Sequence, residues 1–373
     1  MRDVRTVNGY KPDAAPARRD ALAEKILSAT TGAMEMFSIY LGDRLGLYEV
    51  LAQDGPLTCA ELARRTGTAE RYICEWLEHQ TVAGLLTVDD PGARAGRRFS
   101  LPIGHDEVLA NPESVHYLAP IAQLLAGVVS PLSSLVDAYR SGRGIPYSAY
   151  GADTIEGQGR INRSTFLHQL GPVWLAAMPD VDARLRAPGA AIADLGCGAG
   201  WSTIAMAQHY RTAVVHGLDS DAPSIDLARS NALSHLDVGA ADRTEFRVAD
   251  AGDPAMVGHY DLVTAFECIH DMTDPVGGLG TMRRLLKAGG TALVVDERVA
   301  SSFLGDDGEL DGLMYGWSIL HCLPVGLHGH GAAGTGTVMR PATLERYAKQ
   351  AGFTRMDILP IDAGFFRVYR LYP

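Results

Sequence analysis

The sequence predicts an α/β protein in which a parallel sheet wrapped by helices follows a smaller, mostly helical domain. From about residue 190 to the C-terminus, short apolar strand segments alternate with helical segments, which is the pattern of a parallel sheet. Before that point, apolar residues recur at helical spacing instead. The chain has 373 residues, more than one growing hydrophobic core accommodates, so at least two domains are expected.

Composition and charge exclude several classes of protein. Hydrophobic residues make up 47% and charged residues 21% of the chain, as in folded proteins that live in water. The net charge of −11 disfavours nucleic acid and anionic membranes as partners. The 5 cysteines form no CxxC pair, which argues against a disulfide framework or a zinc knuckle. Residues 1–20 lack the apolar core of a secretory signal, so we expect a disordered or extended tail and a cytoplasmic protein.

Residues 21–112 have the pattern of a winged-helix domain. A short helix at 57–67 ends in glycine, and a second helix follows over 68–83, which together predict a helix-turn-helix. Two short strand segments, 85–88 and 98–101, flank a Pro- and Gly-containing turn and complete the wing.

A winged helix serves either DNA binding or dimerisation. The candidate recognition helix, residues 70–82, carries three glutamates against one arginine, whereas a helix that faces phosphates is basic. We therefore favour a dimerisation domain and expect no nucleic-acid partner. Three arginines between residues 94 and 98 keep a DNA-binding wing open as an alternative.

Residues 113–159 are predicted to form an interface helix and a connector. The segment 117–136 is uncharged over about the length of a membrane span. Because it contains two prolines, a glutamine and three serines, we interpret it as a buried helix and expect no membrane association. The Gly-rich stretch 141–159 is turn-prone, so the second domain is placed at residues 160–373.

A glycine-rich turn marks a ligand site at the start of the parallel sheet. The strand 190–195 runs directly into Gly196, Gly198 and Gly200, and a helix begins at Trp201. Glycine lets the backbone approach a ligand closely. A dinucleotide fingerprint requires a small residue where Trp201 stands, so recognition of a pyrophosphate is disfavoured.

Acidic residues stand at the ends of three successive strands. Asp194 precedes the glycines and suits a ligand that carries a cation or an amine. Asp219 follows the next strand, about where a carboxylate accepts hydrogen bonds from ribose hydroxyls. Asp250 follows the third strand, and its carboxylate together with the backbone N–H of Ala251 suits an adenine ring.

These motifs, together with Leu286-Lys-Ala-Gly-Gly290 before the strand 291–295, resemble those of class I methyltransferases that use S-adenosylmethionine. The resemblance implies a Rossmann-like, seven-stranded sheet closed by a hairpin of the segments 356–359 and 365–371. With the winged helix in front, the chain is similar to the small-molecule O-methyltransferases of secondary metabolism, which implies a homodimer formed through the N-terminal domain. The residues expected to bind S-adenosylmethionine are Asp194, Gly196, Gly198, Gly200, Asp219, Ser220, Asp250, Ala251 and Glu267.

The catalytic group is expected after the strand 260–266. His270 resembles the general base of the O-methyltransferases, and a neutral imidazole that titrates near its ordinary pKa can take a hydroxyl proton. Glu297 could orient His270 or the acceptor, or instead pair with Arg298. His321 lies on an apolar helix, where it is either a core residue or part of the site.

Two other functions stay open at this point. His270, Asp271 and His321 supply two imidazoles and a carboxylate, the ligand set of non-haem iron; this resembles the iron-dependent enzymes that C-methylate 2-oxoacids. The other is a winged-helix transcription regulator that keeps a degenerate methyltransferase domain as a sensor.

Overall fold

The computed structural model describes residues 14–92, 96–251, 258–305 and 308–373. They separate into two compact units, the first reaching Asn111 and the second beginning at Pro112. The second unit therefore includes residues 113–159, which the sequence pattern set apart as an interface helix and a connector.

The first unit is mostly helical and carries a small hairpin. Its elements are α1 (Ala14–Arg44), α2 (Leu47–Asp54), α3 (Cys59–Thr66), α4 (Glu70–Val82), β1 (Thr87–Val88), β2 (Phe99–Ser100) and α5 (His105–Leu109). Thr58 and Glu61 form a capping box at the start of α3, and Gly67 ends this helix with φ 66°. With β1 and β2 paired antiparallel, the predicted winged helix is confirmed.

The predicted N-terminal tail is shorter than expected, because a helix begins within it. We expected residues 1–20 to be disordered or extended, but α1 begins at Ala14. The segment from Ala14 to Arg19 is rich in alanine and arginine, which are strong helix formers. Residues 1–13 lie outside the described part of the chain.

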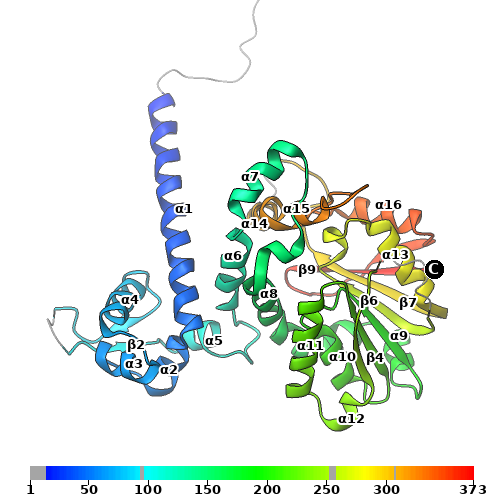
Figure 1. Cartoon of the computed structure of the whole chain (residues 1–373), viewed down its shortest axis with the longest axis horizontal. Helices are drawn as coiled ribbons and strands as arrows, with labels where there is room; N and C mark the ends of the chain where they lie inside the picture. The colour runs from blue at the N-terminus through cyan, green and yellow to red at the C-terminus, as the bar shows by residue number, and fades with distance from the viewer. Residues whose placement is uncertain (1–13, 93–95, 252–257, 306–307) are drawn as a thin grey trace, which may run out of the picture. The chain divides into compact units, whose positions relative to one another are not determined.

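The second unit is built on a seven-stranded sheet (Figure 1). The strands are β3 (Ala191–Leu195), β4 (Val214–Asp219), β5 (Thr244–Val248), β6 (Tyr260–Phe266), β7 (Leu286–Glu297), β8 (Arg355–Ile358) and β9 (Phe366–Tyr372). Their order is β5-β4-β3-β6-β7-β9-β8. The first five strands run parallel, and β9 pairs antiparallel with both β7 and β8. The predicted Rossmann-like sheet with a closing hairpin is confirmed.

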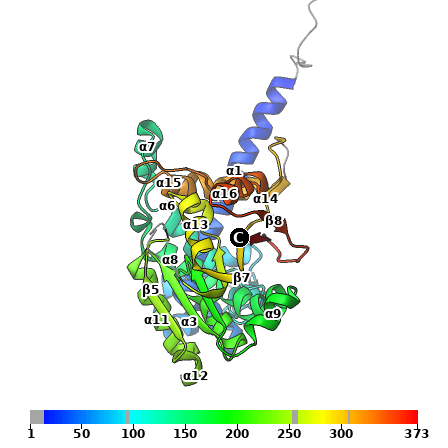
Figure 2. The same ribbon diagram turned by 90° about the vertical axis from the view of Figure 1, so that its right-hand side faces the viewer.

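Helices cover both faces of this sheet, so its central strands are buried on both sides. One hydrophobic core packs η2 (Phe166–Leu175), α9 (Pro179–Leu185), α10 (Trp201–His209) and α11 (Ala222–His235) on one face. The core of the other face packs α13 (Pro275–Leu285) and α16 (Pro341–Gln350), which lie together in Figure 2. Further elements of this unit are α12 (Val238–Ala241), η3 (Ile269–Asp271), α14 (Gly308–Trp317), η4 (Ser318–Cys322) and α15 (Leu323–Gly326).

The uncharged segment 117–136 does not form one long helix. It is divided between α6 (Pro120–Val129) and α7 (Leu132–Ser141), which meet at Pro131 with a bend of 52°. Among the described residues no single helix is long and apolar enough to cross a membrane, and this bent pair is the one combination that passes by length and composition.

The predicted connector 141–159 is wrong in part, because its glycines serve helix packing. After a short 3₁₀ turn, η1 (Tyr147–Tyr150), helix α8 (Gly151–Thr165) begins inside this stretch. A Cβ at Gly157 would lie 2.6 Å from the backbone N of Leu124 on α6, a distance that carbon does not tolerate. The glycine thus permits a close helix crossing, and α8 becomes a wall of the cavity described next.

Candidate active site

One large cavity opens at the carboxyl edge of the parallel strands. Its volume is about 1440 Å³. It is lined by the glycine turn after β3, by Asp219 and Ser220 after β4, by the segment 249–251 after β5 and by the segment 266–274 after β6. Glu297 at the end of β7 also lines it. The carboxyl ends of parallel strands meet at this edge, so residues from five strand ends converge. Helices α6, α8 and α14 supply its largely apolar walls.

The glycine turn is shaped by positive backbone angles. Gly196, Gly198 and Gly200 have φ of 67°, 51° and 83°, a region that other residues enter at a cost. A Cβ at Gly196 would lie 2.7 Å from Cys268 Sγ, whereas a Cβ at Gly198 would meet no atom within 4 Å. Gly198 therefore leaves space for a ligand beside the turn.

Asp194 does not line the cavity. It is fully buried beneath the glycine turn, where its carboxylate accepts hydrogen bonds from Ser202 Oγ at 2.6 Å, Thr203 Oγ1 at 2.7 Å and Thr264 Oγ1 at 2.8 Å. Burial raises the pKa of Asp194. The sequence suggested contact with a cationic ligand, but in the structure this residue fastens the start of α10 to β3 and β6, because all its hydrogen bonds are internal.

Asp219, Ser220, Asp250 and Ala251 line the cavity beside the turn, where the sequence predicted them. Asp219 Oδ2 accepts from the backbone N–H of Gly198 at 2.8 Å, and its Oδ1 accepts from that of Asp221 at 2.9 Å. Burial raises the pKa of Asp219. These hydrogen bonds orient the carboxylate and leave lone pairs for two hydroxyl groups of a ligand.

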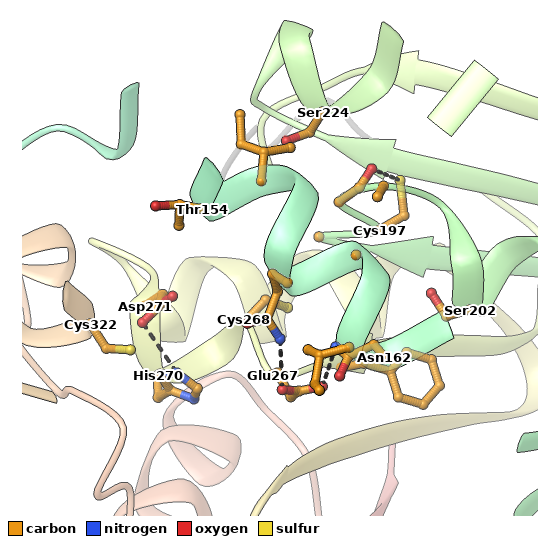
Figure 3. Close-up of a pocket in the computed structure, with 18 of the residues that line it drawn as sticks. Thr154, Asn162, Cys197, Ser202, Ser224, Glu267, Cys268, His270, Asp271 and Cys322 are labelled. Atoms are coloured by element: carbon orange, nitrogen blue, oxygen red, sulfur yellow. Dashed lines mark hydrogen bonds and ion pairs between the residues drawn. The ribbon is translucent and has the colours of Figure 1, made fainter. Parts of the chain in front are cut away.

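Glu267 lies between the turn and His270 in an unusual backbone conformation. Its φ is 52°, the one positive value of a non-glycine residue in the described part of the chain. Its carboxylate accepts from Asn162 Nδ2 at 2.8 Å and Gln158 Nε2 at 3.1 Å (Figure 3). Burial raises the pKa of Glu267 to about 7. Such strain is typical of functional sites, and two amides of α8 hold the side chain in place.

His270 is held between carboxylates from two elements. Its Nδ1 lies 3.0 Å from both oxygens of Asp296 and 3.3 Å from Glu297 Oε2, at the end of β7. Its Nε2 lies 3.2 Å from Asp271 Oδ1, on the side of the cavity shown in Figure 3. Asp296 therefore fixes the ring orientation, and Nε2 is the nitrogen available to an acceptor.

These charges correct the expectation of an imidazole with an ordinary pKa. Burial lowers the pKa of His270, but the charges of Asp296, Glu297 and Asp271 outweigh it and raise the pKa well above the usual range. The same interaction with His270 offsets burial at Asp271, whose pKa is lowered. These neighbouring charges favour the protonated form of His270, and removing one of them would lower its pKa.

His321 reaches the same cavity from η4. Its ring packs edge-on against Tyr150 at 4.5 Å and Tyr147 at 5.7 Å between centroids. Burial lowers the pKa of His321, so the imidazole is neutral at physiological pH. Its Nδ1 lies 3.4 Å from Cys322 Sγ, while its buried Nε2 has no hydrogen-bond partner within the described structure. An unsatisfied buried nitrogen in a cavity marks a place for a ligand.

The three residues of the alternative iron site, which the sequence did not favour, do not assemble as a group. In the described part of the chain, the ligand atoms of His270 and Asp271 come within 4.8 Å of one another together with Cys322, and those of His270 come equally close to Asp296 and Glu297. His321 joins neither cluster. A set of His270, Asp271 and His321 therefore remains a prediction that this geometry does not support.

Sequence reasoning missed several residues of the site. Glu297 was named from the sequence but Asp296 was not, although the two are the last residues of β7. Gln158 and Asn162 lie in the segment interpreted as a connector and the helix after it, and they gave no signal. A helical spacing of four residues between them was the one available hint.

Comparison with known proteins agrees with this geometry. Residues 187–321 match the family described as methyltransferase domain, and residues 33–111 match the Rv2258c-like winged HTH domain. Ubiquinone biosynthesis O-methyltransferase of Pseudomonas aeruginosa is 30% identical over 197 residues, which cover 52% of this chain and 75% of that protein.

Solved structures share the whole fold at low identity. Mitomycin 7-O-methyltransferase superposes with a TM-score of 0.66 at 20% identity and covers 96% of this chain and 99% of its own. Human N-acetylserotonin methyltransferase superposes with a TM-score of 0.65 at 19% identity and covers 94% and 97%. From its glycine turn, its strand-end acids and these relatives, the chain belongs to the class I methyltransferases that use S-adenosylmethionine, in the branch with an N-terminal winged-helix domain.

Proposed function

We propose that the chain transfers the methyl group of S-adenosylmethionine to a hydroxyl group of a small, largely apolar acceptor of secondary metabolism, with His270 as the general base. The observation that supports this most is the placement of His270. Asp296 holds its Nδ1, while its Nε2 faces the cavity that contains the glycine turn and Asp219.

The residues present fit the cofactor. Gly198 leaves open space beside the turn, Asp219 offers a carboxylate for the ribose hydroxyls, and the segment 249–251 lines the cavity where an adenine would lie. Glu267, between these groups and His270, suits the positive charges of the methionine part. When bound, S-adenosylmethionine supplies a methyl group already activated by its sulfonium.

The protein's own contribution is alignment, exclusion of water and proton removal. The apolar walls from α6 and α14 keep water away from the acceptor. Asp296 accepts from Nδ1–H of His270, so that Nε2 can take the hydroxyl proton. Glu297, which contacts the same Nδ1 at 3.3 Å, adds negative charge that stabilises the resulting imidazolium.

Turnover and binding by His270→Gln test this function. General-base catalysis contributes roughly 10²–10⁴-fold to a rate, so formation of S-adenosylhomocysteine with an accepted phenol should fall by that factor. Calorimetry with S-adenosylhomocysteine should give an unchanged affinity, because His270 lies outside the turn. A variant that keeps full turnover on its true acceptor would remove His270 as the base.

We further propose that the first unit mediates homodimerisation. Helix α1 has 31 residues, and several of its large apolar side chains are more than half exposed. They are Leu22, Ile26, Leu27 and Met34. Exposed apolar stripes of this kind mark protein interfaces. Light scattering should give a dimer for the intact chain and a monomer for the double variant Ile26→Glu and Leu27→Glu.

The winged helix is proposed to serve this assembly and not DNA. On α4, Arg71 pairs with Glu75, and Arg97 of the wing pairs with Glu78. Arginines engaged in this way do not supply the basic face that phosphates require. A gel-shift assay with the protein's own promoter region should show no specific complex, and a salt-sensitive specific one would favour a transcription regulator.

A further inference from the structure

The charge of the cavity lining constrains the acceptor. Within the described part of the lining there are carboxyl groups but no lysine and no arginine. The carboxyl groups belong to Asp219, Asp221, Asp250, Glu267, Asp271, Asp274 and Glu297. The nearby Arg163 of α8 is engaged with Glu113 and the carbonyl oxygen of Pro112. An anionic acceptor would therefore find no lysine or arginine in this lining, and the imidazole of His270 is already flanked by three carboxylates, those of Asp271, Asp296 and Glu297.

Most of these carboxylates cap a helix, contact His270 or lie on the cofactor side of the cavity. Asp221 caps α11 and Asp274 caps α13 through backbone N–H groups. Asp219, Asp250 and Glu267 lie on the cofactor side of the cavity. Glu297 contacts Nδ1 of His270. Asp271 contacts Nε2 of His270 (Figure 3), and its partly exposed side chain also lines the cavity.

Asp271 and His321 both offer hydrogen-bond acceptors to this cavity. Asp271 lies in the cavity with its side chain 23% exposed, and its Oδ1 lies 3.2 Å from His270 Nε2. His321 has a buried Nε2 without a hydrogen-bond partner in the described residues, and the charge of Asp271 acts on its ring. A carboxylate and a neutral imidazole nitrogen both accept hydrogen bonds, which is what an ammonium group, a donor without acceptors, requires.

Aromatic rings complete this end of the cavity. Tyr147 and Trp317 line it, and the ring of Tyr147 packs against His321. Faces of such rings attract organic cations. Aliphatic side chains also line the cavity, namely Leu118 before α6 and Ile121, Leu124 and Val128 on α6.

We propose that the acceptor is an apolar molecule that carries a protonated amine, and that Asp271 and His321 bind this amine while a hydroxyl group of the same molecule faces His270. This inference rests on the proposed function and specifies its substrate class. The hydroxyl loses its proton to His270 and gains the methyl group, so the amine remains unchanged.

Three phenols that differ at one end test this inference. They are 4-(2-aminoethyl)phenol, 4-propylphenol and 3-(4-hydroxyphenyl)propanoate, titrated by calorimetry into the full chain saturated with S-adenosylhomocysteine. We expect the amine to bind at least about tenfold more tightly than the neutral phenol, and the carboxylate to bind more weakly than both. Equal affinities, or a preference for the carboxylate, would overturn the proposal.

Two asparagine variants test whether Asp271 is the carboxylate that binds the amine. Asp271→Asn should reduce the affinity for the amine to that for the neutral phenol, about tenfold or more, and leave the neutral phenol unaffected. Asp274→Asn is the matched control, since it removes the same charge three residues away and asparagine still caps α13; it should keep the preference. An amine preference that survives Asp271→Asn would show that another carboxylate binds the amine.

Two further measurements separate the possible failures. If EDTA abolishes the preference and the protein holds stoichiometric metal that Asp271→Asn releases, the carboxylate binds a metal ion and the amine proposal fails. Heat with S-adenosylhomocysteine reports the cofactor site alone, and turnover of any phenol reports the methyl transfer. The proposed function can therefore fail while amine binding persists, or hold while the amine preference is absent.

Discussion

Gly198→Ala separates the role of the glycine turn in ligand binding from its role in folding. At φ 51° an alanine costs about 1–2 kcal/mol. Its Cβ would meet no protein atom within 4 Å, so no steric cost is added in the ligand-free protein. In the complex the same methyl group occupies the space beside the turn. Overfilling a packed contact costs about 1–3 kcal/mol, which corresponds to roughly 5- to 150-fold in affinity.

A second glycine supplies the control for this variant. Gly189 has φ 80°, a Cβ there would also meet nothing within 4 Å, and the residue is exposed outside the cavity. Thermal unfolding should show similar destabilisation for Gly189→Ala and Gly198→Ala. Calorimetry with S-adenosylhomocysteine should show weakened binding for Gly198→Ala alone. Equal affinity of both variants would refute the argument that the turn's backbone contacts the cofactor.

Three other predictions concern single side chains. Asp219→Ala should weaken S-adenosylhomocysteine binding by at least about tenfold, because hydrogen bonds to a charged group contribute about 1.5–3 kcal/mol each, and calorimetry measures this. Thr264→Val removes a donor to the buried Asp194 and should lower the free energy of unfolding in urea by about 1–3 kcal/mol; unchanged stability would contradict an anchoring role for Asp194. For Asp271→Asn, the pH–rate profile of a neutral phenol should shift to lower pH. His270 is a base only when neutral, so the rate rises with pH through its raised pKa, and the variant removes one of the charges that raise it.

The sequence predicted the sheet and the cofactor side of the site well because those signals are local. A strand, a turn and a helix occupy adjacent residues around Gly196–Gly200, and strand-end acids meet at one edge in any parallel sheet. Asp219, Ser220, Asp250 and Ala251 consequently line the cavity together. Asp194 also stands at a strand end, but its side chain turns away from the cavity and accepts hydrogen bonds from Ser202 and Thr264. No local sequence pattern reveals this pairing.

The cavity wall formed by helix α8 was not predicted from the sequence. Glycine in a sequence indicates a turn when only local conformation is considered. Gly157 and Gly159 are instead required by tertiary contact, since a Cβ at Gly159 would lie 2.6 Å from Ala199 Cβ. The prediction of a connector hid the helix that carries Gln158 and Asn162. The raised pKa of His270 was not predicted either, because it depends on charges of β7 that are distant in the sequence.

Asp271 contacts the proposed base, His270, and is also the proposed binding partner of the acceptor's amine. The distance from Asp271 Oδ1 to His270 Nε2 is 3.2 Å, so the charge bound at Asp271 affects His270. An ammonium group that binds Asp271 offsets the negative charge that this carboxylate exerts on His270. Asp296 and Glu297 on β7, Glu267 directly after β6 and the Cys322 thiol also act on His270. The pKa of His270 should therefore fall when an amine acceptor binds. Because kcat/KM reports the free enzyme and kcat the complex, the kcat profile of 4-(2-aminoethyl)phenol should lie at lower pH than its kcat/KM profile. With 4-propylphenol the two profiles should coincide, and the same separation for both phenols would show that Asp271 does not link acceptor charge to the base.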